Sequence, residues 1–489
     1  MRNFYFIAFY DWLMLRANKM LLSCFALLVL FVAFALWTGQ QRVDFHQTTL
    51  DKVKATEKRL FAEKSQLVAD LEQSGKPFTG NSHRDPTEPN GAANSAANRY
   101  FSLAPTPLAV VAVGQSDLRA YYYKFGLHKK QALYHGEEIE NAAILYNGHF
   151  DLAFVITFLL PLLIIALTFN VVASEKERGT LPLILAGTTS LRNVALNKLV
   201  FRFGLLSLFF SGLVLIGLAL VGISIAQEAA GIAALLGVTT AYAAFWFGLS
   251  FGVNSQGKGS GFNAAVLVGV WLALLVVLPA LLSVAANAYY PMPSRVELIA
   301  ETREASEEAK KNGAQILAQY FEDHPELAAQ GSKPVDTKNF AASSLMVNLE
   351  VEKAIRPLEE KFEVQKDKQA RLVAQWRFVS PAIFVQQMLE NIAATGDAHY
   401  LDFEQQMLNA HAKYRAFFTQ KIIKQEKMRA TDYDQVPKSQ YTHSPGLVRA
   451  TRAGFWDILW LLGAGFIAII WGLLQVAPRK MAEPRWIEA

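Results

Sequence analysis

The sequence has one cysteine in 489 residues, Cys24, and that residue lies within a long apolar stretch. A single cysteine cannot form an intramolecular disulfide, so any domain in an oxidising compartment must be stabilised by its apolar core. Charged residues are also scarce, at 18% of the chain, and six long runs contain none. This shortage of charge excludes an ordinary soluble protein and predicts a membrane protein with sizeable aqueous parts.

The six charge-free runs predict six membrane-spanning helices. Each run reaches the roughly 20 apolar residues that cross the hydrocarbon core as a helix. A helix is required because backbone polar groups within lipid must be satisfied inside the segment. The expected spans are 20–38, 152–173, 203–226, 230–252, 263–286 and 456–476. Ala33-Phe34-Ala35 resembles a signal-peptidase site, but the apolar run continues through Trp37, so the first span is predicted to be retained.

The distribution of lysine and arginine predicts the orientation of these spans. Both terminal segments, residues 174–202 and the loop around Lys258 carry an excess of basic residues, which places them in the cytoplasm. Residues 1–19 combine aromatic and apolar residues with Arg2, Asp11 and Arg16, a pattern that predicts an interfacial helix rather than a simple hydrophobic extension. Residues 477–489 are a predicted cytoplasmic tail.

The two longest connections, 39–150 and 288–452, are nearly balanced in charge and are predicted to be insertions on the opposite, periplasmic side. Leucines at helical spacing from Leu50 to Leu71 extend the first span outward. Residues 107–113, PLAVVAV, predict a short strand, whereas the second insertion has mostly helical composition. The predicted fold is therefore an α-helical membrane protein with six transmembrane helices and a large, mainly α domain containing some β structure.

The segment 174–200 joins the second and third spans and is the strongest candidate for a functional site. It begins Glu175-Lys176-Glu177-Arg178-Gly179-Thr180 after Ser174. A short helix here could seat on a partner, with Glu175, Glu177 and Arg178 in charge-assisted contacts. Gly179 permits a tight bend, and Thr180 is placed to cap the residues after it. The alternative is an ordinary basic loop held inside by topology alone.

Signatures of catalysis and of cofactor binding are missing from the sequence. Residues 252–259, GVNSQGKG, nearly match a phosphate-binding loop, but Gly259 stands where Ser or Thr is needed to reach magnesium. The nine histidines are not spaced as metal ligands, and hydrolase motifs are absent. Basic residues alternate with acidic ones, which argues against nucleic acid as a partner. We therefore predict a non-enzyme with no catalytic, cofactor-binding or metal site.

The few polar residues within the spans are expected to hydrogen-bond between helices: Asn170, Thr168, Ser207, Ser211, Ser250 and Ser283. No ion pair is expected inside the spans. That argues against a proton- or sodium-coupled carrier, which usually keeps ionisable groups at mid-membrane.

Three passages resemble ABC-2 type transporter permeases of the subgroup that carries the DUF3526 region. The first is the Glu175–Thr180 string with Lys198 downstream. The second is PLAVVAVGQSDL at residues 107–118, followed by Tyr121, Tyr122 and Tyr123. The third is SPAIFVQQ at residues 380–387, with ATGD at 394–397 and Phe403. Pro182 departs from the family pattern and is expected to shorten or shift the helix in the 174–200 segment.

The resemblance implies the transmembrane subunit of an ATP-driven exporter in a bacterial inner membrane. Its expected partners are ABC ATPase subunits that bind Mg-ATP, a second permease copy or a sister permease, membrane lipids and a periplasmic protein. Residues 174–180 would then couple the permease to the ATPase. A mechanotransmission or scaffold protein, which passes ATP-driven motion outward without transport, is the alternative. An ATP-independent membrane anchor is a third hypothesis. The apolar spans slightly favour an amphipathic cargo.

Overall fold

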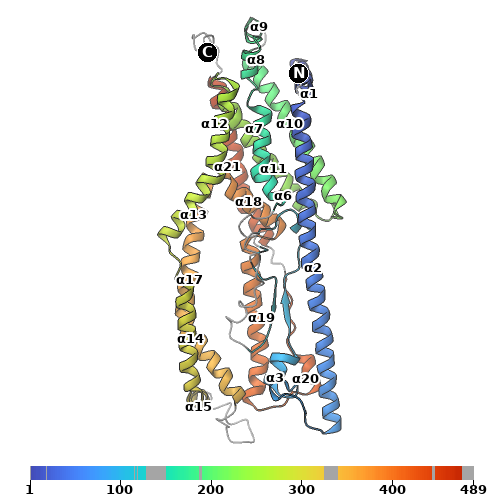
Figure 1. Ribbon diagram of the computed structural model, residues 1–489, viewed down its shortest axis with the longest axis vertical. Helices are drawn as coiled ribbons and strands as arrows, with labels where there is room; N and C mark the ends of the chain where they lie inside the picture. Colours follow the sequence, from blue (N-terminus) through green and yellow to red (C-terminus); the bar gives the residue numbers. More distant parts are fainter. Residues whose placement is uncertain are drawn as a thin grey trace.

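The computed structural model describes residues 2–17, 19–114, 116–117, 119–127, 150–186, 190–323, 340–442 and 446–475. The described chain is elongated and almost entirely helical (Figure 1). A bundle of apolar helices forms one half, and a column of helices with a small sheet forms the other. We call the end of the bundle that carries α1 (Arg2–Ala17), α8 (Ala173–Glu177) and α9 (Leu181–Ala186) the proximal end.

Among the residues that the structure describes, six helices are long and apolar enough to cross a membrane, which agrees with the predicted number. They are Met20–Ser74, Leu152–Glu177, Leu191–Leu220, Ala229–Asn254, Ser260–Tyr289 and Gly454–Gln475. The second comprises α6 (Leu152–Phe154), the π-helical turn η5 (Val155–Leu159), α7 (Leu160–Thr168) and α8. The third is α10 (Leu191–Leu220) and the fourth is α11 (Ala229–Asn254). The fifth is α12 (Ser260–Leu272), η6 (Ala273–Val277) and α13 (Leu278–Tyr289), and the sixth is the greater part of α21 (Gly446–Gln475).

The bundle has an apolar outer face, as expected for helices bathed in lipid. Large apolar side chains are exposed there, among them Leu22, Leu30, Leu208, Ile216, Leu220, Phe466 and Ile467. At one crossing two backbones meet without side chains between them: a Cβ on Gly248 of α11 would lie 2.4 Å from the carbonyl oxygen of Gly465 on α21. Small residues allow such close approach of membrane helices. α11 and α21 are therefore packed backbone to backbone at this point.

The first span does not stop at the membrane. α2 (Met20–Ser74) is one continuous helix of 55 residues that runs most of the length of the molecule (Figure 1). It ends at Gly75, whose φ of +64° is a left-handed conformation that closes helices. The predicted outward continuation through Leu50 and Leu71 is confirmed, and Leu50 is fully buried.

The far half of the molecule, which we call the distal domain, is built from described residues in the ranges 44–127, 295–376 and 397–442. α19 (Asp397–Ile423) lies beside α2, with the antiparallel strands β1 (Tyr100–Ser102) and β2 (Tyr122–Lys124) between them (Figure 1). The short helices α3 (Pro89–Gly91) and α20 (Ala430–Gln435) lie near its tip. A separate apolar core fills it, with Phe101, Phe403 and Tyr414 among its fully buried residues. The Tyr414 hydroxyl donates to the carbonyl of Ala93 at 2.7 Å.

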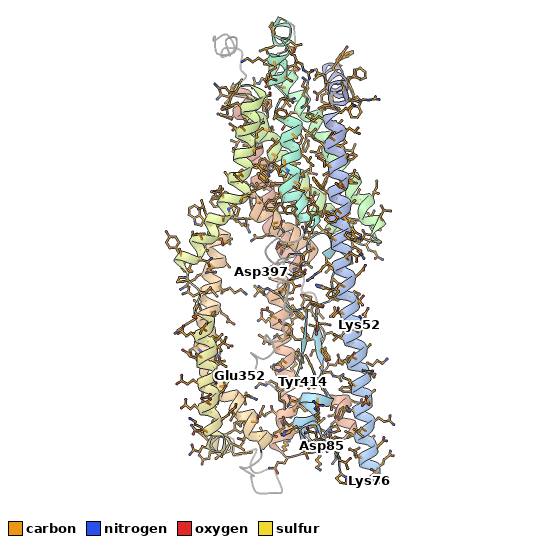
Figure 2. The ribbon with its side chains drawn as sticks, viewed as in Figure 1. Lys52, Lys76, Asp85, Glu352, Asp397 and Tyr414 are labelled. Atoms are coloured by element: carbon orange, nitrogen blue, oxygen red, sulfur yellow. The ribbon has the colours of Figure 1, made fainter. Side chains whose placement is uncertain are left out.

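An antiparallel arm stands on the other side of α19. It consists of α14 (Arg295–Lys311), α15 (Gly313–Asp323) and the long α17 (Phe340–Trp376). An ion pair at 2.9 Å between Glu352 of α17 and Arg415 of α19 connects the arm to α19. Glu352 is labelled in Figure 2. At its base, Gln369 donates to the carbonyl of Tyr290 at 2.7 Å.

The predicted strand at 107–113 is wrong. Pro107–Val110 form a turn of 3₁₀ helix, η3, with Pro107 at its start, and residues 108–112 are buried where η3 meets the bundle. A short apolar run can be a buried helical turn as easily as a strand, and periodicity cannot separate the two. η3 packs so tightly on α2 that a Cβ on Gly39 would lie 2.2 Å from the carbonyl oxygen of Val110. The β structure lies instead at 100–102 and 122–124, the second strand overlapping the tyrosine triplet.

Two further expectations differ from the structure in their bounds. The sequence predicts the third span at 203–226, but its helix already begins at Leu191. It ends at Leu220, just before Gly222, which takes a φ of +90°. The expected helix at 294–330 is broken at Asn312 between α14 and α15. The predicted tail at 477–489 lies outside the described residues.

Candidate functional site

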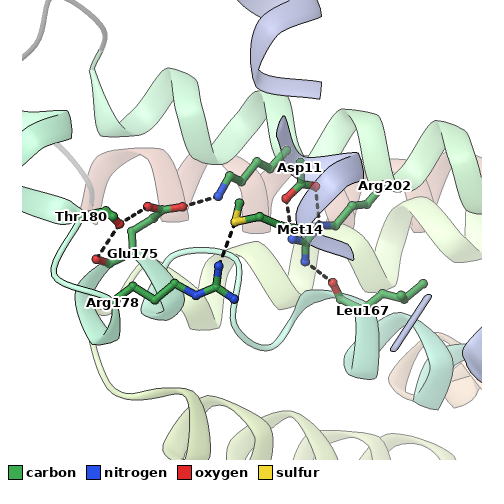
Figure 3. Close-up of polar contacts among 8 residues, drawn as sticks. Asp11, Met14, Leu167, Glu175, Arg178, Thr180 and Arg202 are labelled. Carbon is green, nitrogen blue, oxygen red and sulfur yellow. Dashed lines mark hydrogen bonds and ion pairs between the residues drawn. The ribbon is translucent and has the colours of Figure 1, made fainter. Parts of the chain in front are cut away.

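The charged segment 174–200 lies at the proximal end and folds as two short helices and the start of a span. α8 ends at Glu177, residues 178–180 turn, and α9 begins at Leu181 (Figure 3). Gly179 has a φ of +71°, a conformation that favours glycine, and nothing within 4 Å would meet a Cβ there. Pro182 stands in the first turn of α9, where its missing N–H costs nothing. The expected single short helix is thus interrupted at the glycine.

The Glu175 side chain is buried, and its contacts are with other residues of this protein. Its carboxylate forms an ion pair with the ammonium of Lys198 on α10 and accepts a hydrogen bond from the hydroxyl of Thr180 (Figure 3). The side chains of Glu175 and Lys198 are only 11% and 5% exposed. Thr180 turns back to the preceding helix and closes the turn around Gly179. This trio therefore fixes α8 to the third span, 23 residues further along the chain.

Glu177 joins the segment to the fifth span. Its Oε1 accepts from the backbone N–H of Ser260 at 2.8 Å, at the first turn of α12. A carboxylate at a helix N-terminus is stabilised by the partial positive charge of the free N–H groups. The glycine-rich turn before α12, which resembles a phosphate-binding loop in sequence, lies against this carboxylate: a Cβ on Gly259 would be 3.8 Å from Glu177 Oε1.

Arg178 and Gly179 are exposed at the tip of this segment, together with Glu177. The Arg178 guanidinium contacts the sulfur of Met14 on α1 at 2.9 Å (Figure 3). Of the five predicted site residues, the structure therefore buries Glu175, uses Thr180 to close the turn, and leaves Glu177, Arg178 and Gly179 facing outward. Contacts from this segment reach α1, α10 and α12.

A second buried ion pair beneath the segment is not evident from the sequence. Arg202 of α10 makes a two-pronged contact with Asp11 of α1, with Nη2 to Oδ1 at 2.7 Å and Nε to Oδ2 at 2.8 Å (Figure 3). The same guanidinium donates to the carbonyl of Leu167 at the end of α7. Asp11 is 0% and Arg202 6% exposed at the side chain. This pair joins α1 to the proximal end of α10, outside the predicted span 203–226, so it does not bear on the expectation that the spans contain no ion pair.

Sequence reasoning missed this pair because Asp11 and Arg202 each stand beside a charge-free run and resemble flanking charges. The only available signal was an aspartate on the apolar side of α1. The structure shows that face packed on the bundle through Ala8, Asp11 and Leu15, with Phe6, Phe9 and Tyr10 exposed on the other side. α1 is thus fixed to the spans by a salt bridge as well as by its apolar face.

Neutral polar residues connect the spans deeper in the bundle, as predicted for Thr168 and Ser250; the prediction is wrong for Ser207, whose hydroxyl is buried without a hydrogen-bond partner among the described residues. The hydroxyls of Thr168 and Ser250 bond to each other between α7 and α11. Asn254 donates to the carbonyl of Thr168 at 3.0 Å, and Asn263 of α12 donates to that of Phe169 at 3.3 Å. The two asparagines satisfy carbonyls exposed where α7 ends and the chain turns toward α8. Three spans therefore meet at the helix break that precedes the charged segment.

The junction between bundle and distal domain contains a buried carboxyl group. Glu390 lies on α18 (Pro381–Ala393), whose apolar face packs into the core of the bundle, and accepts from Gln386 at 3.1 Å. Burial is the main cause that raises its pKa to about 7; the hydrogen bond from Gln386 opposes this rise, and the nearby charges of Asp151 and Asp397 add to it. Asp151 caps α6 and accepts from the N–H of Val113 at 2.8 Å. Asp397, labelled in Figure 2, pairs with Arg119 at 2.6 Å.

Glu390→Gln is expected to stabilise the protein above neutral pH. In the wild type the unfolded carboxyl ionises near pH 4.5 and the folded one near 7, so stability falls as pH rises through that interval. Glutamine mimics the protonated acid, and the gain at pH 8 should be about 1–3 kcal/mol. Thermal unfolding in detergent at pH 8 and pH 4.5 measures it. Equal midpoints for both proteins at pH 8 would contradict the prediction, and Glu404→Gln, which alters an acid outside the bundle, is the control.

Within the described ranges, no three histidine, cysteine or acidic side chains are grouped so that they could hold a metal ion. The arrangement of the described residues is that of a multi-pass membrane protein whose charged proximal segment is bonded to several spans at once.

Comparison with known families agrees with this arrangement. Residues 5–301 match the family described as ABC-2 family transporter protein. Residues 295–442 match a domain of unknown function, DUF3526, which covers most of the arm, α18 and α19. No curated protein and no solved structure matches the chain.

Because the first match covers more than half of the sequence, the chain belongs to the ABC-2 transporter permease family, in the group that also carries DUF3526. Both parts of the sequence resemblance are thereby confirmed. Such permeases are in general non-catalytic membrane subunits that work with ABC ATPases.

Proposed function

We propose that this protein is the permease subunit of an ATP-driven exporter of the bacterial inner membrane. Residues 174–180 contact the partner ATPase and couple its ATP hydrolysis to the permease. On this proposal the proximal end and both termini face the cytoplasm, the distal domain lies in the periplasm, and Mg-ATP binds to a partner ATPase. A second copy, or a sister permease, completes the transporter.

The observation that supports this most is how the charged segment is held. Its exposed tip, Glu177 to Gly179, is connected to α10 through Glu175 and Lys198, to α12 through Glu177 and Ser260, and to α1 through Arg178 and Met14. A partner that pushed on this tip would displace three helices together. Interior contacts of this density transmit a displacement because packed elements move as units.

Co-purification in detergent with a candidate ABC ATPase tests the proposal. Arg178→Glu reverses the charge of the exposed tip, and we expect it to weaken the complex at least about tenfold, or roughly 1.4 kcal/mol. Lys424→Glu makes a comparable change at the exposed end of α19 and should leave the complex intact. If the wild type bound no candidate ATPase, a membrane anchor would be the better description. If Arg178→Glu bound as well as wild type, the contact would lie elsewhere.

A mechanotransmission role is the second candidate, and one observation favours it. α2 continues without a break from the bundle into the distal domain, so motion of the first span reaches the far end directly. Spin labels at Lys76 in the two copies would report this motion (Figure 2). An ATP-dependent change in their separation without any transport would favour mechanotransmission. An unchanged separation during transport would exclude it.

A further inference from the structure

A cavity of about 780 Å³ opens in the distal domain between three segments that are far apart in the sequence. One wall is the outer part of α2, from Lys54 to Ser65. The second is β1 with its flanking residues, and the third is the stretch 434–441, which begins within α20. Both insertions therefore contribute to it. Its volume is in the range of pockets that bind small organic ligands.

The inner wall is built around Arg99. The guanidinium carbon lies 3.7 Å from the centre of the Phe61 ring, and Nη1 is 3.2 Å from a carboxylate oxygen of Glu57. Arg99 and Glu57 are 13% and 14% exposed at the side chain. Arg99 Nε is buried and has no hydrogen-bond partner among the residues that the structure describes. A buried, incompletely bonded donor costs free energy unless a ligand or water satisfies it.

The remaining charges of the cavity are mainly positive. Lys54, Lys58 and Lys438 line its more open parts and are opposed there by Asp434. With Arg99 and Glu57 included, four basic residues face two acidic ones. Aromatic rings line it as well, namely Phe61, Tyr100 and Tyr441. Rings and guanidinium planes accept flat apolar groups, while ammonium groups attract anions into a concave surface.

We propose that this cavity binds a small organic anion with a flat, apolar body. The body lies against the aromatic rings, and the anionic groups approach Lys54, Lys58 and Lys438, with Arg99 as the donor on the inner wall. This binding site is independent of the ATPase contact proposed above. Because its walls come from both insertions, a bound ligand would hold α2 and the 434–441 stretch together.

The full-length protein in detergent is titrated into 8-hydroxypyrene-1,3,6-trisulfonate, a flat aromatic anion, and fluorescence anisotropy is followed. We expect saturable binding that weakens as salt is raised, since screening reduces attraction between exposed charges. Lys54→Gln/Lys58→Gln removes two cations from the cavity and should raise Kd at least about tenfold, since the polyanion meets both at once. Lys52→Gln/Lys76→Gln removes two exposed lysines, one on α2 and one just beyond its end, outside the cavity, and is the matched control (Figure 2).

Arg99→Lys is a second test, because it keeps the charge and loses the planar donor. It should also raise Kd. The thermal midpoint of the variant should stay unchanged, which shows that the substitution acts on the ligand and not on the fold. Absence of saturable binding to the wild type would overturn the proposal. So would an equal loss in the cavity and control variants, which would mean general attraction to a basic surface.

Discussion

Asp11→Asn is expected to destabilise the protein by about 3–5 kcal/mol, the usual cost of removing one partner of a buried ion pair. The substitution leaves the charge of the Arg202 guanidinium, 6% exposed, without a carboxylate; the carbonyl of Leu167 and one amide oxygen of the new side chain are the acceptors that remain in this contact. α1 would also lose its charged attachment to α10. Thermal unfolding in detergent, with size-exclusion chromatography to detect aggregation, measures the effect.

A double variant distinguishes the destabilisation caused by an unpaired buried charge from the net contribution of the ion pair to the free energy of unfolding. Asp11→Leu/Arg202→Met replaces both partners by apolar side chains of similar bulk, and should recover most of the stability lost in Asp11→Asn. Asp44→Asn, at a contact with Gln40 on the exposed side of α2, is a control in which an aspartate is removed without isolating a charge. A thermal midpoint of Asp11→Asn within about a degree of wild type would show that α1 does not depend on this pair.

Glu175→Gln is the second substitution with a large expected effect. It leaves the Lys198 ammonium, 5% exposed, without its carboxylate and weakens the turn that Thr180 closes. We expect a loss of about 3–5 kcal/mol in stability and a loss of ATP-driven activity in the complex with the ATPase. Differential scanning fluorimetry and the ATPase rate of the reconstituted complex provide the two measurements.

The charge exchange Glu175→Lys/Lys198→Glu distinguishes an internal role from direct contact with the ATPase. If Glu175 serves to hold α8 against α10, the exchanged pair should regain stability and activity that Glu175→Lys alone has lost. If instead Glu175 bound the ATPase, the exchange would restore stability and leave the complex broken. The burial of Glu175 leads us to expect recovery of both.

Much of the architecture was predictable because it depends on long, local patterns. Six charge-free runs predicted six membrane helices, and leucine spacing predicted the extension of α2 beyond the first span. Length decides such cases: a run of about 20 apolar residues has few other stable structures. The short run at 107–113 has no such length, and its environment among α2 and α18 decided its conformation.

The position of the site in the chain was predictable, but the contacts that each of its residues makes were not. The string from Glu175 to Thr180 marks the segment, yet only the fold brings Lys198 to Glu175 and Ser260 to Glu177. Asp11 and Arg202 are 191 residues apart, and their pairing depends on how α1 docks against α10. Pairs of residues this far apart in the sequence are brought together by tertiary packing. The local residue spacing of one sequence does not reveal them.

The unbroken α2 is long enough to serve as a lever arm. About 36 residues of it lie beyond the predicted end of the first span, and at 1.5 Å per residue they reach ~54 Å. A tilt of ~10° about the predicted end of the first span would therefore move Ser74 by roughly 9 Å, whereas residues at the pivot would stay in place. Rearrangements too small to resolve among packed spans would be magnified at the tip, where a reporter group can be attached without disturbing the bundle.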